Sequence, residues 1–179
     1  HIPFCNTVCY YCACNKVVTK DRGKSIEYLQ ALDREAGLIS DRLTGTRTVE
    51  QLHVGGGSPT FLDNDQLRQL MAIITRRFSL AAGAEVGVEV DPRGTPPDKV
   101  RVLRELGFNR ISIGVQDFDP QVQKAVNRLQ SFEITQQTVE AARDAGFKSI
   151  NLDLIYGLPR QTRDTFATTL DKVLVLSPE

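Results

Sequence analysis

Hydrophobic and polar residues recur along the chain with two different periods. In the longer segments apolar side chains return every three or four positions, which indicates helices with one buried face. Shorter segments have apolar residues at every second position, which indicates strands. The predicted strands are 49–54, 84–90, 110–116 and 148–155, after a strand end at 1–4, and the predicted helices are 25–43, about 64–78, about 96–106, 132–145 and about 162–175. This alternation predicts a parallel sheet with helical crossovers.

Several predicted helices carry residue types that begin or end helices. Asp63 stands three residues before Gln66, the spacing of a capping box, and Thr95 is placed to cap the helix that follows it. Gly107 and Gly146 end two helices, because glycine adopts the left-handed conformation of a helix end at little cost. A Phe and then a predicted strand follow each of these glycines. The repeated junction supports a chain built from successive strand–helix units.

The predicted strands from residue 84 onward each have one aliphatic face and one small or polar face. Strands of an open sheet that is covered by helices on both sides would be aliphatic on both faces. The pattern therefore favours a barrel or part-barrel with a polar interior. Glu89, Gln116 and Asp153 lie on the polar face near the carboxyl ends of their strands, where parallel barrels carry their chemistry. The polar face comprises Glu85, Gly87, Glu89, Asp91, Ser112, Gly114, Gln116, Ser149, Asn151, Asp153 and Ile155.

Length and charge narrow the classes of protein to consider. A chain of 179 residues is expected to form one domain with a sizeable core. Its 22 basic and 22 acidic residues balance, which gives no electrostatic reason to expect nucleic acid or an anionic membrane as a partner. No apolar run reaches the roughly 18 residues of a transmembrane helix. All four cysteines lie in one short stretch, which favours a reduced, cytoplasmic protein whose thiols bind metal.

Cys5, Cys9 and Cys12 follow a CxxxCxxC pattern, which supplies three thiolates in one loop after a strand end. Thiolates are ligands of both iron–sulfur clusters and zinc. A structural zinc site has four ligands, usually as two pairs on separate turns, whereas three thiolates leave one iron of a four-iron cluster open. Cys14 is separated from Cys12 by a single residue, and side chains so close rarely bind one metal together. A structural zinc site remains an alternative at this point.

Longer strings around these motifs extend across the chain: HIPFCxxxCxYCxCN, GGGSPTFL, EVDPR, ISIGVQDF and NLDLIYGLPRQT. With them the sequence resembles the radical S-adenosylmethionine (SAM) superfamily and, within it, the oxygen-independent coproporphyrinogen III oxidases. The resemblance implies an α/β fold, a partial (β/α)6 TIM-like barrel that is truncated, with about five strand–helix units present. It makes residues 1–179 an incomplete core domain, without an N-terminal segment, the last strand–helix unit and a C-terminal domain.

The resemblance also implies two cofactors, a [4Fe–4S] cluster and SAM. Cys5, Cys9 and Cys12 would bind the cluster, and SAM would complete its open iron. Taken alone, Arg128 would be interpreted as an exposed charge at a helix end. Strand parity also selects three of the residues that the resemblance places at SAM, namely Glu89, Gln116 and Asp153, so two lines of reasoning agree on them. The residues that the resemblance places at SAM are Tyr11, Gly56, Gly57, Ser58, Glu89, Gln116, Arg128, Asp153 and Ile155.

The implied reaction is the oxidative decarboxylation of coproporphyrinogen III to protoporphyrinogen IX, without oxygen, in haem biosynthesis. A 5′-deoxyadenosyl radical, formed from SAM by one electron from the cluster, would abstract a hydrogen from a propionate side chain. Loss of CO2 and one electron would then leave a vinyl group. The implied partners are this substrate and an electron donor such as a flavodoxin or ferredoxin, and the protein is expected to be a cytoplasmic monomer.

A haem chaperone built on the same radical SAM core is the alternative function, since such a protein would bind and transfer haem without oxidase activity. Cys14 favours the oxidase, because the related chaperones usually have an aromatic residue at its position. Apart from this distinction, Cys14 is expected to be a free thiol packed in the loop.

Overall fold

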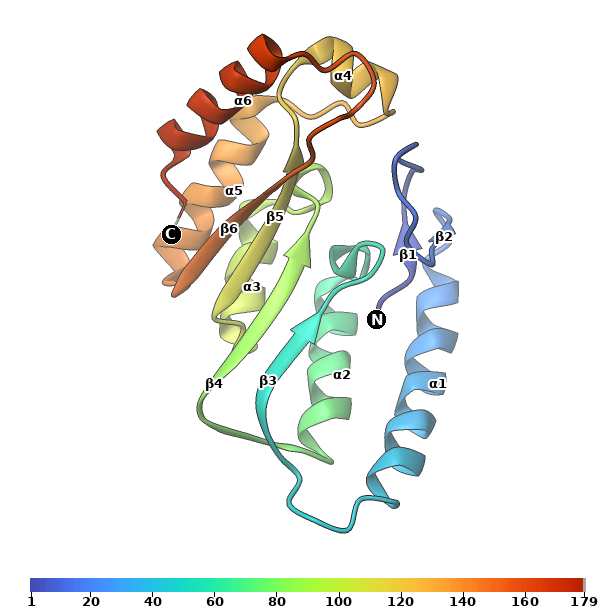
Figure 1. Cartoon of the computed structure of the whole chain (residues 1–179). Helices are drawn as coiled ribbons and strands as arrows, with labels where there is room; N and C mark the ends of the chain where they lie inside the picture. Colours follow the sequence, from blue (N-terminus) through green and yellow to red (C-terminus); the bar gives the residue numbers. More distant parts are fainter. Residues whose placement is uncertain (179) are drawn as a thin grey trace.

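A computed structural model describes residues 1–178 as a series of strand–helix units (Figure 1). The last residue of the predicted domain, Glu179, lies outside the described residues. The strands are β1 (Phe4–Cys5), β2 (Val17–Val18), β3 (Thr48–Val54), β4 (Ser79–Val90), β5 (Arg110–Gln116) and β6 (Ser149–Leu154). The helices are α1 (Gly23–Ser40), α2 (Asn64–Thr75), α3 (Pro97–Glu105), α4 (Pro120–Ala125), α5 (Phe132–Ala145) and α6 (Arg163–Leu176), with short 3-10 helices η1 (Pro59–Phe61) and η2 (Pro92–Gly94).

Four parallel strands form the sheet in the order β3-β4-β5-β6, which is also their order along the chain. A helix between consecutive parallel strands is the usual crossover, because a short turn cannot return the chain to the same end of the sheet. β1 and β2 pair with each other, and the segment that contains β1 meets the sheet through a bridge between Ile2 and Gly56. The predicted α/β fold with a parallel sheet is therefore confirmed. Within residues 1–178 the sheet is open, with β3 and β6 at its edges.

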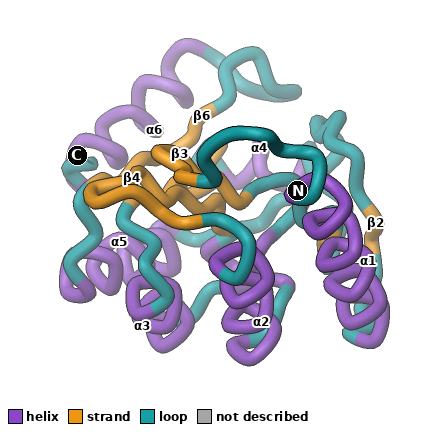
Figure 2. Tube along the Cα trace, turned by 90° about the horizontal axis from the view of Figure 1, so that it is seen from below, coloured by secondary structure: helices purple, strands orange, loops and turns teal. Residues whose placement is uncertain are grey.

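The aliphatic faces of the strands form the core together with a row of helices. Figure 2 shows α1, α2, α3 and α5 along one side of the sheet. There Val88, Ile111 and Ile113 of the sheet and Leu67 and Leu103 of the helices are at most 1% exposed and belong to one core. Full burial of such a side chain contributes roughly 1.5–3 kcal/mol, so this layer holds the helices on the sheet. The small or polar face of the strands is left free to form the site.

The predicted capping box is confirmed at the start of α2. The Asp63 side chain accepts a hydrogen bond from the Gln66 backbone N–H at 2.8 Å, and the Gln66 side chain accepts from the Asp63 N–H at 3.2 Å. The prediction that Thr95 caps α3 is wrong, because Pro96 occupies the N-cap position. Thr95 Oγ1 instead donates to the Asp91 carbonyl at 2.7 Å, which stabilises the turn after β4.

The first long helix, α1, ends at Ser40 rather than at the predicted residue 43. Leu29 is fully buried, whereas Ile26 and Ile39, expected on the same buried face, are 49% and 50% exposed. These side chains are exposed because α1 stands at one end of the row of helices and has a neighbouring helix on one side only (Figure 2). Neither α1 nor any other helix within residues 1–178 is long and apolar enough to cross a membrane.

One helix, α4, was not predicted from the sequence. Its six residues are too short to show a helical period. Asp119 marks its start, since its side chain accepts from the backbone N–H groups of Gln121 and Val122, with Pro120 at the first turn. The helix places the loop that follows it, residues 126–130, beside the amino-terminal segment.

Candidate functional site

The segment around the first cysteine and the glycine-rich segment after β3 are hydrogen-bonded to each other. Ile2 N–H donates to the Gly55 carbonyl, Gly57 N–H to the Ile2 carbonyl and Ser58 N–H to the Phe4 carbonyl, each at 2.8 Å. The two backbones run so close that a Cβ on Gly57 would lie 2.9 Å from the Phe4 carbonyl oxygen. The glycine therefore allows an approach that a side chain would block.

Residues 5–14, here called the cysteine loop, are also held by the loop after α4. Tyr10 N–H donates to the Val126 carbonyl at 3.0 Å, and Asn127 Nδ2 donates to the Val8 carbonyl at 2.7 Å. Asn127 adopts a left-handed backbone conformation with φ of 55°, which asparagine tolerates better than most residues. The cysteine loop is thus positioned from two sides by parts of the chain that are distant in sequence.

A cavity of about 360 Å³ lies between the cysteine loop, the glycine-rich segment and the carboxyl ends of β4, β5 and β6. Every predicted site residue except Ile155 lines it. Ile155 packs instead with Tyr11 against the small apolar cluster of Val122, Val126 and Leu158. The structure therefore brings residues from six separate segments to one cavity, since Arg128 adds the loop after α4, and the cavity lies at the end of the sheet where chemistry was expected.

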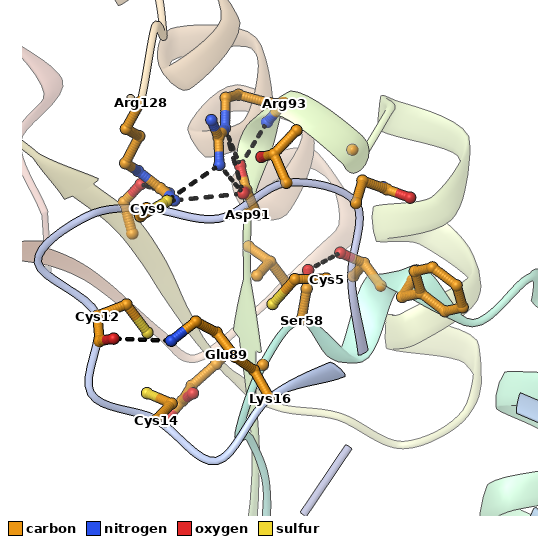
Figure 3. Close-up of a pocket in the computed structure, with 18 of the residues that line it drawn as sticks. Cys5, Cys9, Cys12, Cys14, Lys16, Ser58, Glu89, Asp91, Arg93 and Arg128 are labelled. Carbon is orange, nitrogen blue, oxygen red and sulfur yellow. Dashed lines mark hydrogen bonds and ion pairs between the residues drawn. The ribbon is translucent and has the colours of Figure 1, made fainter. Parts of the chain in front are cut away.

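All four cysteines line this cavity with their thiols free (Figure 3). Burial raises the pKa of Cys5 to about 11. Burial would also raise the pKa of Cys12, but its hydrogen bonds with Cys14 and the charge of Lys16 lower it below the ordinary value. Lys16 Nζ also donates to the Cys12 carbonyl at 2.7 Å. Among residues 1–178, no group of three or more His, Cys, Asp or Glu side chains has the arrangement of a single-ion metal site.

Two carboxylates from the polar face of the sheet point into the cavity. Glu89 accepts from the Gly56 backbone N–H at 3.2 Å, and its other oxygen lies 3.0 Å from His53 Nε2. Asp153 accepts from Ser112 Oγ at 2.7 Å. Burial raises the pKa of Asp153, and the negative charge of Glu89 adds to the shift, although the Ser112 hydrogen bond opposes it. Both carboxylates keep oxygen atoms available to a ligand with hydroxyl or ammonium groups.

Gln116 reaches the cavity from an irregular point at the end of β5. Its φ of 68° is left-handed, and the register between β5 and β6 shifts between Gly114 and Gln116. Irregularities of this kind redirect a side chain and are frequent beside active sites. A Cβ on Gly114 would lie 2.9 Å from Gln116 Nε2, so the glycine leaves the space that this side chain occupies.

Arg128 is buried, with 7% of the residue exposed, so its interpretation as an exposed charge at a helix end is wrong. Its Nη2 donates to the Gly114 carbonyl at 2.7 Å and its Nη1 to Asp91 Oδ2 at 3.3 Å. The Nε atom is buried and has no hydrogen-bond partner among residues 1–178. A buried donor without a partner is costly, and the Arg128 side chain that carries it lines the cavity.

Asp91 and Arg93 belong to the site but were not selected from the sequence. Arg93 donates to Asp91 through Nε at 2.9 Å and through Nη2 at 2.6 Å. Burial would raise the pKa of Asp91, but the hydrogen bonds of Arg93 and the charge of Arg128 lower it below the ordinary value. Two features of the sequence could have identified these residues: the EVDPR string, and the placement of Asp91 on the polar face of its strand.

Residues 1–173 match the family described as the Radical SAM superfamily. An oxygen-independent coproporphyrinogen III oxidase of Pseudomonas aeruginosa is 56% identical over 181 residues, which cover 100% of this chain and 39% of that protein. A protein of the same name from Escherichia coli is 48% identical over 179 residues, with the same coverage. The chain thus spans about two fifths of the length of these curated relatives.

The fold agrees with a solved structure from this family. The coproporphyrinogen III oxidase HemN of Escherichia coli, described as a radical SAM enzyme, superposes with a TM-score of 0.95 at 48% identity. The superposition covers 99% of this chain and 41% of that one. A family match over nearly all of the chain agrees with the cysteine pattern and with the parallel sheet beneath it. The chain therefore belongs to the radical SAM superfamily.

Proposed function

We propose that this chain forms the cofactor-binding core of an oxygen-independent coproporphyrinogen III oxidase, an oxidoreductase that converts coproporphyrinogen III to protoporphyrinogen IX. The observation that carries the proposal is 56% identity, over all of the chain, to a relative of that name. A low-potential flavodoxin or ferredoxin would supply electrons. The cofactors of the superfamily are a [4Fe–4S] cluster and SAM, and the residues of the cavity fit both.

Cys5, Cys9 and Cys12 would hold the cluster. Three thiols on one loop line the same cavity, and the donor type is the one that iron–sulfur clusters take. The three thiolates would bind three different irons and so need a wider spacing than the ligands of one ion. The absence of a single-ion arrangement among residues 1–178 is therefore compatible with a cluster. Cys14 is exposed and hydrogen-bonded with Cys12, and we assign it no ligand role.

Arg128, Glu89 and Asp153 would orient SAM. Arg128 lines the cavity, and its guanidinium would supply a donor for the SAM carboxylate, since a charge-assisted bond of this kind is among the stronger ones in proteins. Glu89 and Asp153 present acceptors to the ammonium and hydroxyl groups. Tyr11, Gly56, Gly57, Ser58 and Gln116 line the remaining wall. Ile155 lies behind this wall, in contact with the same apolar cluster as Tyr11, and would support it.

When bound, the cluster supplies one electron to SAM, and SAM supplies the group that takes a hydrogen atom from the substrate. The chain's own contribution is to hold these partners in a fixed geometry. Gly57 holds the segment that leads into the cysteine loop, Asn127 holds the loop itself, and the carboxylate and guanidinium groups are held by neighbours in the sheet. Positioning of this kind limits the freedom of a reactive group.

The test is an anaerobic assay of the full-length protein after cluster reconstitution. Iron and sulfide contents and the visible absorption spectrum report the cluster, and 5′-deoxyadenosine and methionine report SAM cleavage. We expect protoporphyrinogen IX and CO2 from coproporphyrinogen III with a low-potential reductant. SAM cleavage without decarboxylation, together with haem binding and transfer, would instead support the haem chaperone. Retention of zinc without an iron–sulfur spectrum would contradict both.

A further inference from the structure

The EVDPR string contains a pair of charged residues that the proposed SAM contacts do not require. Asp91 follows β4 directly and Arg93 lies in η2, where the Asp91 side chain also accepts from the Arg93 backbone N–H at 3.1 Å. The guanidinium meets both carboxylate oxygens, Nε at 2.9 Å from Oδ1 and Nη2 at 2.6 Å from Oδ2. Their side chains are only 21% and 22% exposed, so the guanidinium has a fixed orientation.

The fixed guanidinium is directed at one particular thiol. Arg93 Nη2 donates to Cys9 Sγ at 3.7 Å, and Arg128 Nη1 donates to the same sulfur at 3.7 Å (Figure 3). Asp91 lies between the two arginines and accepts from both. Two positive charges and one negative charge leave a net positive charge beside this sulfur. Cys9 is the only cysteine among residues 1–178 for which the structure shows hydrogen bonds from arginine side chains.

We propose that Arg93, oriented by Asp91, hydrogen-bonds the Cys9 thiolate and raises the reduction potential of the cluster that this thiolate binds. The inference rests on the proposed function, because it needs Cys9 as a cluster ligand. Hydrogen bonds to ligand sulfurs and nearby charge are among the factors that set cluster potentials. Both withdraw electron density from the sulfur and favour the reduced cluster, which carries one more negative charge.

The redox step concerned is a one-electron reduction. A low-potential donor gives one electron to [4Fe–4S]2+, which becomes [4Fe–4S]+, and Arg93 gains and loses no proton. Arg93 is therefore a positioning residue that acts through Cys9. Arg128 contributes a second bond to this sulfur, but it is also placed at the proposed SAM carboxylate, so its substitution would change two properties at once. Arg93 separates the effect on the cluster from the effect on SAM.

The chain offers a matched control on α3. Arg101 forms an exposed ion pair with Asp98, three residues earlier, and its side chain is 58% exposed. This pair resembles Arg93 and Asp91 in chemistry but lies outside the cavity. The variants for the test are therefore Arg93→Met, Arg93→Lys and Arg101→Met, made in the full-length protein and reconstituted anaerobically.

The measurement is the midpoint potential of the loaded cluster, followed by electron paramagnetic resonance during a mediated reductive titration without SAM or substrate. We expect a more negative potential in Arg93→Met, because one charge and one donor are lost. Arg93→Lys should shift the potential less, because lysine keeps the positive charge. It should still shift the potential, because lysine lacks the planar guanidinium that meets both Asp91 oxygens. Arg101→Met should leave the potential unchanged.

Each outcome decides the proposal. A loaded Arg93→Met protein with the parent potential overturns it. If Arg93→Met holds no cluster, a loaded Arg93→Lys protein with a more negative potential than the parent still supports it. If neither variant holds a cluster, the side chain serves the assembly of the loop and the proposal is wrong. A parent protein that takes up no cluster would instead contradict the proposed function, which the iron and sulfide contents reveal separately.

Discussion

Replacement of Gly57 by alanine should loosen the contact between the glycine-rich segment and the segment that leads into the cysteine loop. The added Cβ would lie 2.9 Å from the Phe4 carbonyl oxygen and 2.9 Å from the Pro3 carbonyl carbon and oxygen. All three are backbone atoms, so no side chain can rotate away to relieve the overlap. The strand segment itself must move, and the hydrogen bond from Gly57 N–H to the Ile2 carbonyl must lengthen.

The expected cost follows from this geometry. Overpacking that displaces backbone costs about 1–3 kcal/mol, and a chain of this size loses roughly 2–4 °C in Tm for each kcal/mol. We therefore expect Tm to fall by about 2–12 °C in Gly57→Ala. Because the displaced strand carries Cys5, cluster content after reconstitution should fall as well.

Gly45→Ala is the matched control, since an added Cβ at Gly45 would meet nothing within 4 Å. Thermal unfolding followed by circular dichroism compares the two variants with the parent, and iron and sulfide analysis compares their cluster contents. The reasoning is refuted if Gly57→Ala melts at the same temperature as Gly45→Ala and takes up as much cluster.

Three further predictions concern single side chains. Arg128→Met should weaken SAM binding to the cluster-loaded protein by about 10- to 100-fold, because a hydrogen bond to a charged group contributes about 1.5–3 kcal/mol; unchanged affinity in equilibrium binding would contradict the role of the guanidinium. Asp153 has a raised pKa in the folded state, so its contribution to stability is present at low pH and is lost as the pH rises from 3.8 through that raised value. The free energy of unfolding in urea, measured across this range, should therefore fall less in Asp153→Asn than in the parent, and parallel pH profiles would count against the burial argument. Phe108→Ala should lower the free energy of unfolding by about 3–5 kcal/mol in the same assay, since Phe108 is 0% exposed in the main core. A loss below about 1 kcal/mol would show that the surrounding core relaxes into the space left by the ring.

Local patterns in the sequence were sufficient to predict most of the elements. The strand at 110–116 and the helix at 132–145 have the predicted bounds, because alternation, helical period and a final glycine all depend on residues close together in the chain. Strand parity also identified the polar face that lines the cavity, with Glu89, Gln116 and Asp153 among its residues. The short α4 and the two-residue β2 gave no period to read, and the end of α1 depends on what packs against it.

The sequence by itself thus determined the order of strands and helices, the polar face of the sheet and the family to which the cysteine pattern belongs. Tertiary structure alone decided that Arg128 is buried, that Arg93 meets the sulfur of Cys9 and that Ile155 lies outside the cavity. The physical reason is distance along the chain. Arg93 and Cys9 are 84 positions apart, and their contact depends on the register of parallel strands and on the two anchors of the cysteine loop, which no local pattern encodes.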